Sequence, residues 1–118
     1  MYEAAPVWKL IQHDPNQHLC GAYWDGSLVA TCTLIIIPNL TRGGRSYGLI
    51  ENVVTHPDYR RRELGTAVLR RALEVAWERN CYKVMLLTGS KNEATLQFYE
   101  KVGFQRGVKT GFVAVPGD

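Results

Sequence analysis

The stretch that decides the fold is LIENVVTHPDYRRRELGTAVLRRALEVAWERN, residues 49–80. It opens with a run rich in β-branched residues over 49–55, which favours a strand. Pro57 has no N–H donor and cannot continue a central strand, so a turn is expected there. From Leu64 onward, apolar residues recur at the spacing of an amphipathic helix. The stretch therefore predicts a strand, a turn and a helix, in that order.

The turn between this strand and this helix predicts an anion site. A helix that begins at a bend presents free N–H groups and the positive end of its dipole. Gly65 lets a ligand approach the backbone, and Arg60, Arg61 and Arg62 add positive charge. Such a strand–loop–helix unit suits a pyrophosphate. A plain connector with solvated arginines is the alternative that these features leave open.

The other expected elements surround this unit. The first is a helix within Met1–His13 whose buried side carries Val7, Trp8, Leu10 and Ile11. A second strand after the central helix implies a parallel pair joined by a crossover. Further strands are predicted at 18–24, 27–37 and 83–88, with a hairpin turn at Asp25–Gly26. The loop at 38–45 carries Arg42 and Arg45, which are solvated or contact an anion. A helix at Glu93–Val102, capped by Asn92 and ended by Gly103, precedes one or two strands within 104–115.

The three cysteines form no CxxC pair and are expected to be reduced and structural. A hairpin centred on Asp25–Gly26 with regular pairing would set Cys20 opposite Thr31. Cys20 and Cys32 would then point to opposite faces, which argues against a disulfide between them. The histidines are scattered, so no metal site is predicted.

Composition indicates an ordinary soluble domain. The chain has 118 residues, 46% hydrophobic and 21% charged, and a formal net charge of +3. This predicts a single domain over 1–118 with a real core. Neither a membrane-spanning run nor a signal peptide is recognised, so a cytoplasmic location is expected and no membrane partner. The mild, concentrated positive charge favours a phosphorylated small ligand over nucleic acid.

Two motifs resemble the GCN5-related N-acetyltransferase (GNAT) superfamily. VVTHPDYRRRELGTAVLRRAL, residues 53–73, is similar to its coenzyme A motif, Gln/Arg-x-x-Gly-x-Gly/Ala. KNEATLQFYEKVGFQ, residues 91–105, is similar to its signature N-x-x-A-x-x-F-Y-x-x-x-G-F. The resemblance implies an α/β (α+β) fold with a mixed, mostly antiparallel sheet, a β-α-β crossover, splayed parallel strands and helices on both faces. The family's first strand and helix are expected to be absent, which would leave a sheet edge and favour a homodimer.

The first motif can be aligned in two registers. Placing Arg62 first gives a literal match, Arg62-Glu63-Leu64-Gly65-Thr66-Ala67. Placing Arg60 first is preferred, because Tyr59–Arg60 then falls where the family carries that pair. In this register Glu63 stands where the first glycine belongs. We then expect Glu63→Gly to tighten coenzyme binding and to lower the stability of the free protein.

The family resemblance implies acetyl-CoA as cosubstrate, a primary amine as acceptor and no metal. The residues that the resemblance assigns to the coenzyme are Val53, Val54, Thr55, Arg60, Arg61, Arg62, Leu64, Gly65, Thr66, Asn92 and Tyr99. Tyr99 is also the candidate proton donor to the leaving thiolate, with a packed aromatic as the alternative. Glu51 is the candidate base, with a solvated carboxylate as the alternative. Asn52 alternates to the other face of a regular strand.

The acceptor is the least determined feature. The motif strand has some likeness to glucosamine-6-phosphate N-acetyltransferases, although Asn52 stands where these enzymes carry aspartate. The leading interpretation is an N-acetyltransferase that acts on a small-molecule amine by direct attack in a ternary complex. The alternatives are a catalytically weak coenzyme A-binding module and a protein N-acetyltransferase.

Overall fold

The computed structural model describes residues 2–60 and 62–117, so Arg61 of the predicted site lies outside the described residues. The described chain divides into two compact units, residues 1–86 and 87–118. Each unit is described below by itself. The expectation of a single domain over 1–118 stays a prediction.

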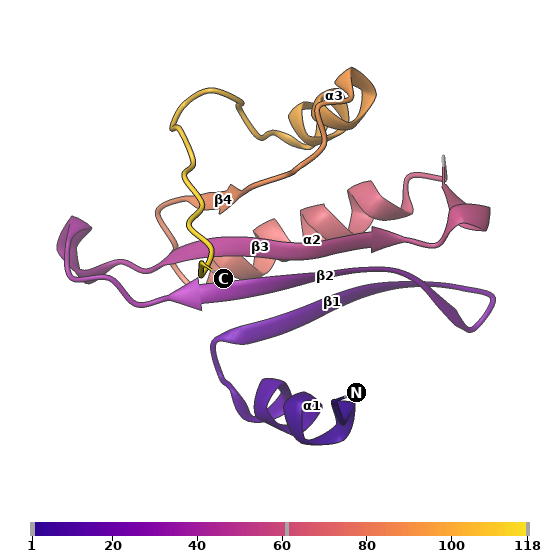
Figure 1. Ribbon diagram of the computed structural model, residues 1–118, viewed down its shortest axis with the longest axis horizontal. Coiled ribbons are helices and arrows are strands. Elements are labelled where there is room, and N and C mark those ends of the chain that lie inside the picture. Colours follow the sequence, from indigo (N-terminus) through magenta and orange to yellow (C-terminus); the bar gives the residue numbers. More distant parts are fainter. Residues whose placement is uncertain (1, 61, 118) are drawn as a thin grey trace. The chain divides into compact units, whose positions relative to one another are not determined.

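The first unit is built on a four-stranded sheet in the order β1-β2-β3-β4 (Figure 1). Its strands are β1 (Gln17–Trp24), β2 (Ser27–Ile37), β3 (Tyr47–Thr55) and β4 (Val84–Leu86). The β1–β2 and β2–β3 pairs are antiparallel, and β3 pairs with β4 in parallel. The mixed, mostly antiparallel sheet and the β3–helix–β4 crossover are thus as predicted, although β4 is shorter than the expected 83–88.

Helix α2 (Leu64–Glu78) packs against β1, β2 and β3 (Figure 1). Its apolar spacing explains why: one face buries Val68, Leu69, Ala72 and Ala76 against the sheet. The core of the unit lies between this face and the inward side of the strands. Buried strand residues that complete it are Cys20, Val29, Ala30, Cys32, Leu34, Ile36 and Ile50.

The C-terminal end of α2 is tied to neighbouring segments of the first unit. At its end, the Arg79 guanidinium donates to Pro15 O and Asn16 Oδ1 and contacts His18 Nε2 at 3.1 Å. Arg45 donates to the carbonyls of Asn80 and Cys81. The loop before β3, whose arginines were expected to be solvated or to contact an anion, therefore secures the connection from α2 to β4 through Arg45.

Helix α1 (Ala4–His13) lies within the predicted 1–13 and ends at His13, before the turn-forming Asp14–Pro15. The expected buried side is wrong: no residue of α1 is buried, and Val7, Trp8 and Leu10 are exposed. The reason is that, within the described part of the unit, no strand or helix packs extensively on α1. None of the described helices is long and apolar enough to span a membrane.

The hairpin turn is confirmed, with φ of 48° at Asp25 and 81° at Gly26. The predicted pairing beyond it is wrong. Trp24 pairs with Ser27 and Tyr23 with Leu28, but a bulge shifts the register so that Ala22 pairs with Ala30. Val29 is the extra residue, and Cys20 consequently faces Cys32 instead of Thr31.

The second unit contains α3 (Glu93–Val102), with the predicted bounds. Asn92 Oδ1 accepts a hydrogen bond from Ala94 N at 2.8 Å, and Gly103 ends the helix at φ 124°. The strands expected within 104–115 are wrong: residues 104–117 contain none, and Phe112, Val113 and Val115 are highly exposed. Apolar alternation cannot make a strand without a pairing partner, and no pairing to this segment is found among the described residues.

Candidate functional site

The strands β3 and β4 pair over only part of β3. Their register runs from Gly48 opposite Val84 to Ile50 opposite Leu86, whereas β3 continues to Thr55. Beyond Ile50, β3 stays paired with β2, through Val54 opposite Thr31 and Thr55 opposite Ala30. Its other edge has no pairing with β4 there. An extended ligand can hydrogen-bond to such an edge as an added strand, so the predicted separation of the parallel strands is present.

A bulge lies in β3 at the point where it leaves β4. Glu51 pairs with Thr33 and Val54 pairs with Thr31, so Asn52 and Val53 together oppose Cys32. Asn52 has φ 55°, a left-handed conformation that asparagine tolerates better than most residues. Because Thr31 and Thr33 share one face of β2, their partners Glu51 and Val54 also share one face. Simple alternation would separate these two, and the sequence analysis missed the bulge.

A compact turn follows the strand. The His56 N–H donates to Val29 O at 2.7 Å, which extends the β2–β3 contact by one residue. The chain then forms a short 3₁₀ turn, Pro57–Tyr59, in which His56 Nδ1 accepts the Asp58 N–H at 3.2 Å. The rings of His56 and Tyr59 meet edge to face, with centroids 5.5 Å apart. These contacts fix the direction in which the chain enters the arginine segment.

The N-terminus of α2 is the candidate anion-binding part of the site. Glu63 precedes the helix in a left-handed conformation, φ 60° and ψ 19°, and its side chain makes no capping hydrogen bond. Its carbonyl accepts the Ala67 N–H at 3.0 Å, the first bond of the helix. The N–H groups of Leu64, Gly65 and Thr66 precede that bond, so they have no acceptor within the helix. They form the positive end of the helix dipole. The left-handed φ is the conformation that glycine adopts most readily, which supports the register that begins at Arg60.

The arginines of the segment have different surroundings. Arg60 is exposed. The Arg62 guanidinium carbon lies 4.9 Å from the centroid of the Trp24 ring and 5.4 Å from that of Tyr59. Arg62 is therefore held between two aromatic rings beside the N-terminus of α2. Trp24 was not expected in the site, because nothing in the sequence indicates that the end of β1 reaches this loop.

The second unit carries Asn92 and Tyr99. Asn92 uses its side-chain oxygen to cap α3, and its N–H donates to Ser90 Oγ at 3.2 Å. The Tyr99 ring contacts those of Phe98 and Phe104, with centroids 5.0 and 6.4 Å apart. Both residues are thus rigidly placed within their own unit.

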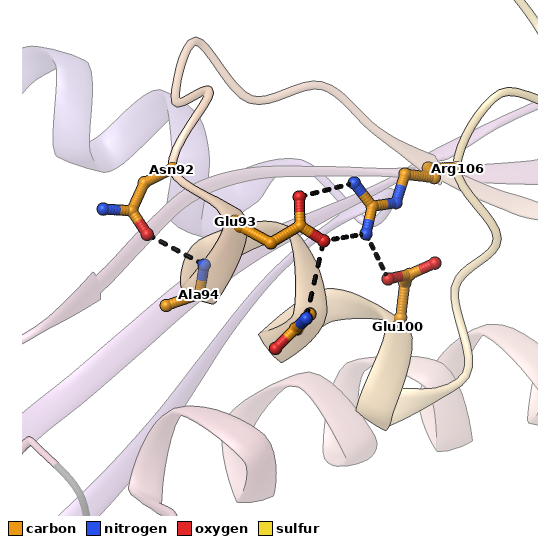
Figure 2. A network of polar contacts seen from close by, with 6 residues as sticks. Asn92, Glu93, Ala94, Glu100 and Arg106 are labelled. Atoms are coloured by element: carbon orange, nitrogen blue, oxygen red, sulfur yellow. Dashed lines mark hydrogen bonds and ion pairs between the residues drawn. The ribbon is translucent and has the colours of Figure 1, made fainter.

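An ion network fixes the chain after α3. Arg106 donates to Glu93 Oε2 at 3.1 Å and to Glu100 Oε1 at 2.8 Å (Figure 2). The Arg106 guanidinium lowers the pKa of Glu93 and, through the same contact, raises its own pKa. The network joins residue 106 back to the first and last turns of α3, the helix that carries Tyr99.

The first unit offers what a diphosphate on an extended arm requires. Backbone N–H donors lie at the start of α2, Arg60 and Arg62 add charge, and β3 has an open edge beyond Ile50. In the described part of the chain, no group of three or more His, Cys, Asp or Glu side chains could hold a metal ion.

Comparison with known proteins agrees with this architecture. The chain belongs to the acetyltransferase (GNAT) family, whose family model matches residues 1–104. A solved structure described as a putative acetyltransferase from Agrobacterium tumefaciens str. C58 has a TM-score of 0.92 and 46% identity, covering 98% of this chain and 80% of that one. The glucosamine-6-phosphate N-acetyltransferase structure from Arabidopsis thaliana has a TM-score of 0.81 and 25% identity, covering 96% of this chain and 76% of that one.

Among curated relatives, the glucosamine 6-phosphate N-acetyltransferase of Trypanosoma brucei brucei is 39% identical over 102 residues. The match covers 86% of this chain and 61% of the relative, so the chain spans less than two thirds of that enzyme's length. The enzyme of the same name from Schizosaccharomyces pombe is 34% identical over 79 residues, 67% of this chain and 68% of the relative.

Proposed function

We propose that this protein transfers the acetyl group of acetyl-CoA to the amine of glucosamine 6-phosphate or a closely related amino sugar phosphate. One observation carries the proposal: β3 leaves β4 after Ile50 and leads, through a bulge and a tight turn, to an uncapped helix N-terminus with arginines beside it. This arrangement suits a cosubstrate that has both an extended arm and a diphosphate.

The residues proposed to hold acetyl-CoA are those that the family resemblance assigns, and their positions support the proposal. The backbone of Val53, Val54 and Thr55 would bond the arm along the open edge of β3. The N–H groups of Leu64, Gly65 and Thr66 would bind the diphosphate, with Arg60 and Arg62 neutralising its charge. When bound, acetyl-CoA supplies an acetyl group already activated as a thioester. Asn92 stays a predicted contact to the arm.

The residues of this chain then have separate chemical tasks. An amine is protonated at neutral pH, and Glu51 is proposed to accept that proton directly or through water. Its exposed position on β3 next to the bulge supports this role. The Val53 and Val54 amides are the candidate donors to the oxyanion that forms during acyl transfer. Tyr99 is proposed to donate a proton to the departing thiolate. Attack in a ternary complex needs no acylated side chain.

The acceptor is proposed from the relatives. Proteins named glucosamine 6-phosphate N-acetyltransferase match this chain at 39% and 34% identity. A streptothricin acetyltransferase from Bacillus subtilis matches a shorter part, 58 residues at 40% identity. The longer matches favour the amino sugar phosphate over an antibiotic. The cytoplasmic location and the homodimer stay predictions.

Free thiol release from acetyl-CoA tests the proposal when the amines are chosen as matched pairs. Glucosamine 6-phosphate and glucosamine differ only in the phosphate, so their ratio of kcat/KM measures phosphate recognition. We expect the phosphorylated sugar to exceed glucosamine, an aminoglycoside and a lysine peptide. Preference for one of the last two would overturn the proposed acceptor while keeping the transferase.

A melting curve separates the non-enzyme alternative. Acetyl-CoA that binds only the native state raises the melting temperature by mass action. A raised melting temperature without thiol release for any amine would mean a coenzyme A-binding module. An unchanged melting curve at millimolar acetyl-CoA would remove the coenzyme site itself.

Intact mass after incubation with acetyl-CoA alone should show no acetylated protein, as direct attack requires.

A further inference from the structure

Two buried cysteines face each other across the β1–β2 hairpin. Cys20 on β1 and Cys32 on β2 are direct partners in the antiparallel register. Both lie on the side of the sheet that packs against α2, with exposed fractions of 7% and 0%. The bulge at Val29 creates this pairing, because regular pairing from the turn would set Cys20 opposite Thr31. The proposed acetyl transfer uses neither thiol.

The pairing places the sulfurs within reach of a covalent bond. Directly opposed residues of antiparallel strands have Cα atoms about 4.5–5.5 Å apart. Disulfides span Cα separations of about 4.4–6.8 Å. A bond between Cys20 and Cys32 therefore fits the register without moving one strand along the other.

The two thiols are chemically unequal. The hydrogen bond with Cys32, aided by the positive charge of Arg71, lowers the pKa of Cys20 to about 7, although burial opposes this. The same contact and burial raise the pKa of Cys32. The Cys32 Sγ also lies 3.9 Å from Val68 O of α2, and its single hydrogen can serve one acceptor at a time. Cys20 is thus the better nucleophile, and it is also the more exposed of the two.

We propose that Cys20 and Cys32 are a redox pair that closes into a reversible intrachain disulfide on reaction with a peroxide. The Cys20 thiolate attacks one peroxide oxygen, the O–O bond breaks, and Cys20 becomes a sulfenic acid while hydroxide leaves. The Cys32 sulfur then attacks Cys20 Sγ, its proton goes to the leaving hydroxyl, and water departs. In total, two thiols and one hydrogen peroxide give one disulfide and two waters, a two-electron oxidation. A dithiol reductant reverses it.

The third cysteine is the built-in control. Cys81 is also buried, but it follows α2 and its N–H bonds to Ala76 O. Burial raises the pKa of its thiol. Cys81 is not one of the two cysteines of the proposed redox pair, so its thiol should stay reduced under the same treatment.

The test treats the native protein with hydrogen peroxide, removes the oxidant, unfolds the protein in acid and counts thiols. The wild type should fall from three thiols to one and recover three after dithiothreitol. Asp25 lies between the two cysteines, so cleavage on the N-terminal side of aspartate separates them unless a disulfide joins the peptides. The oxidised wild type should give residues 14–24 linked to 25–57, with Cys81 still free.

Three single variants give distinct results. Cys81→Ser should fall from two thiols to none. Cys20→Ser should keep both remaining thiols. Cys32→Ser should lose one thiol and gain oxygen at Cys20, because the sulfenic acid has no partner there. Separate 14–24 and 25–57 peptides in the oxidised wild type would overturn the proposal even if a variant failed to fold. Equal thiol loss in Cys20→Ser and wild type would do so too.

Discussion

The Arg62 guanidinium carbon lies 4.9 Å from the centre of the Trp24 ring, which joins the loop before α2 to the end of β1. These residues are separated by the whole of β2 and β3 in the sequence. Tyr59 contacts Arg62 from within the loop at 5.4 Å, so the guanidinium is restrained by two rings while its N–H groups remain available at its edge. We interpret this as pre-organisation of one cation beside the proposed diphosphate site.

Trp24→Leu should therefore weaken acetyl-CoA binding by about 2- to 5-fold, corresponding to the ~0.5–1 kcal/mol of an exposed cation–π contact. The substitution should lower the affinity for acetyl-CoA, measured by titration calorimetry, and should leave the secondary structure intact. Trp77→Leu is the matched control, because Trp77 is a similarly exposed tryptophan on α2. Equal effects of the two substitutions would assign the loss to general packing.

Glu63 requires a revised prediction, because it lies just outside α2 at φ 60° and is not a helical residue. Helix propensity therefore no longer argues against glycine, whereas a left-handed conformation costs a residue with a Cβ about 1–2 kcal/mol. We compare Glu63→Gly with Glu63→Ala, since both remove the carboxylate. The glycine variant should be more stable by ~1 kcal/mol and should bind acetyl-CoA at least as tightly. Identical chemical denaturation midpoints for the pair would show that the backbone at residue 63 relaxes.

Tyr99→Phe should lower kcat by roughly 10²-fold with little change in the KM for acetyl-CoA, as expected for loss of a proton donor. Phenylalanine keeps the ring contacts with Phe98 and Phe104, and the far-UV circular dichroism of the variant checks that α3 is intact. Phe98→Leu is a control for packing within the same helix. Wild-type turnover in Tyr99→Phe would exclude the phenol as the acid.

Glu51→Gln should lower kcat for an amine acceptor, and the loss should shrink as the pH rises toward the pKa of the amine. The reason is that a base is needed only while the amine is protonated. Glu74→Gln, on the exposed surface of α2, controls for the loss of one negative charge. A pH-independent loss would indicate that Glu51 positions the acceptor and does not take its proton.

The Arg106 network predicts an acid-dependent contribution to stability. Arg106 lowers the pKa of Glu93 in the folded state, so the stabilisation is complete above the ordinary glutamate pKa and is lost as pH falls through the lowered value. The difference in unfolding between wild type and Arg106→Ala should be constant near neutrality and vanish in strong acid. Melts across this range measure it, with Arg70→Ala as the control. A difference that persists in strong acid would point to packing instead of charge.

Local sequence signals predicted what local physics controls. Asp25–Gly26 demands positive φ, and Asn92 and Gly103 mark the two ends of α3, so these features matched the structure. The start of α2 at Leu64 was equally readable, because it depends on a turn followed by a helix.

The errors arise where non-local geometry decides. A one-residue bulge at Val29 puts Cys20 and Cys32 on the same face of the sheet, whereas regular pairing would put them on opposite faces. Nothing in the sequence near either cysteine indicates this bulge. An apolar side of α1 was expected to be buried and strands were expected within 104–115, although both depend on a partner that a local pattern does not specify. Trp24 could not be placed beside Arg62 without knowing where β1 ends.

The bulge at Asn52 and Val53 has a consequence for how this chain is compared and engineered. Even-numbered residues of β3 face α2 before the bulge, and odd-numbered residues face it after the bulge. Ile50 and Thr55 show this change, because their partners Leu34 and Ala30 lie on the same face of β2. Substitutions on either side leave this pattern intact, and deleting a single residue at 52 or 53 would remove the bulge while keeping Val54 and Thr55 opposite Thr31 and Ala30. A one-residue alignment gap at this position would thus keep the neighbouring residues in their roles, and a library built across β3 can vary the chain length there, whereas a gap elsewhere in the strand would reverse the facing of the residues beyond it.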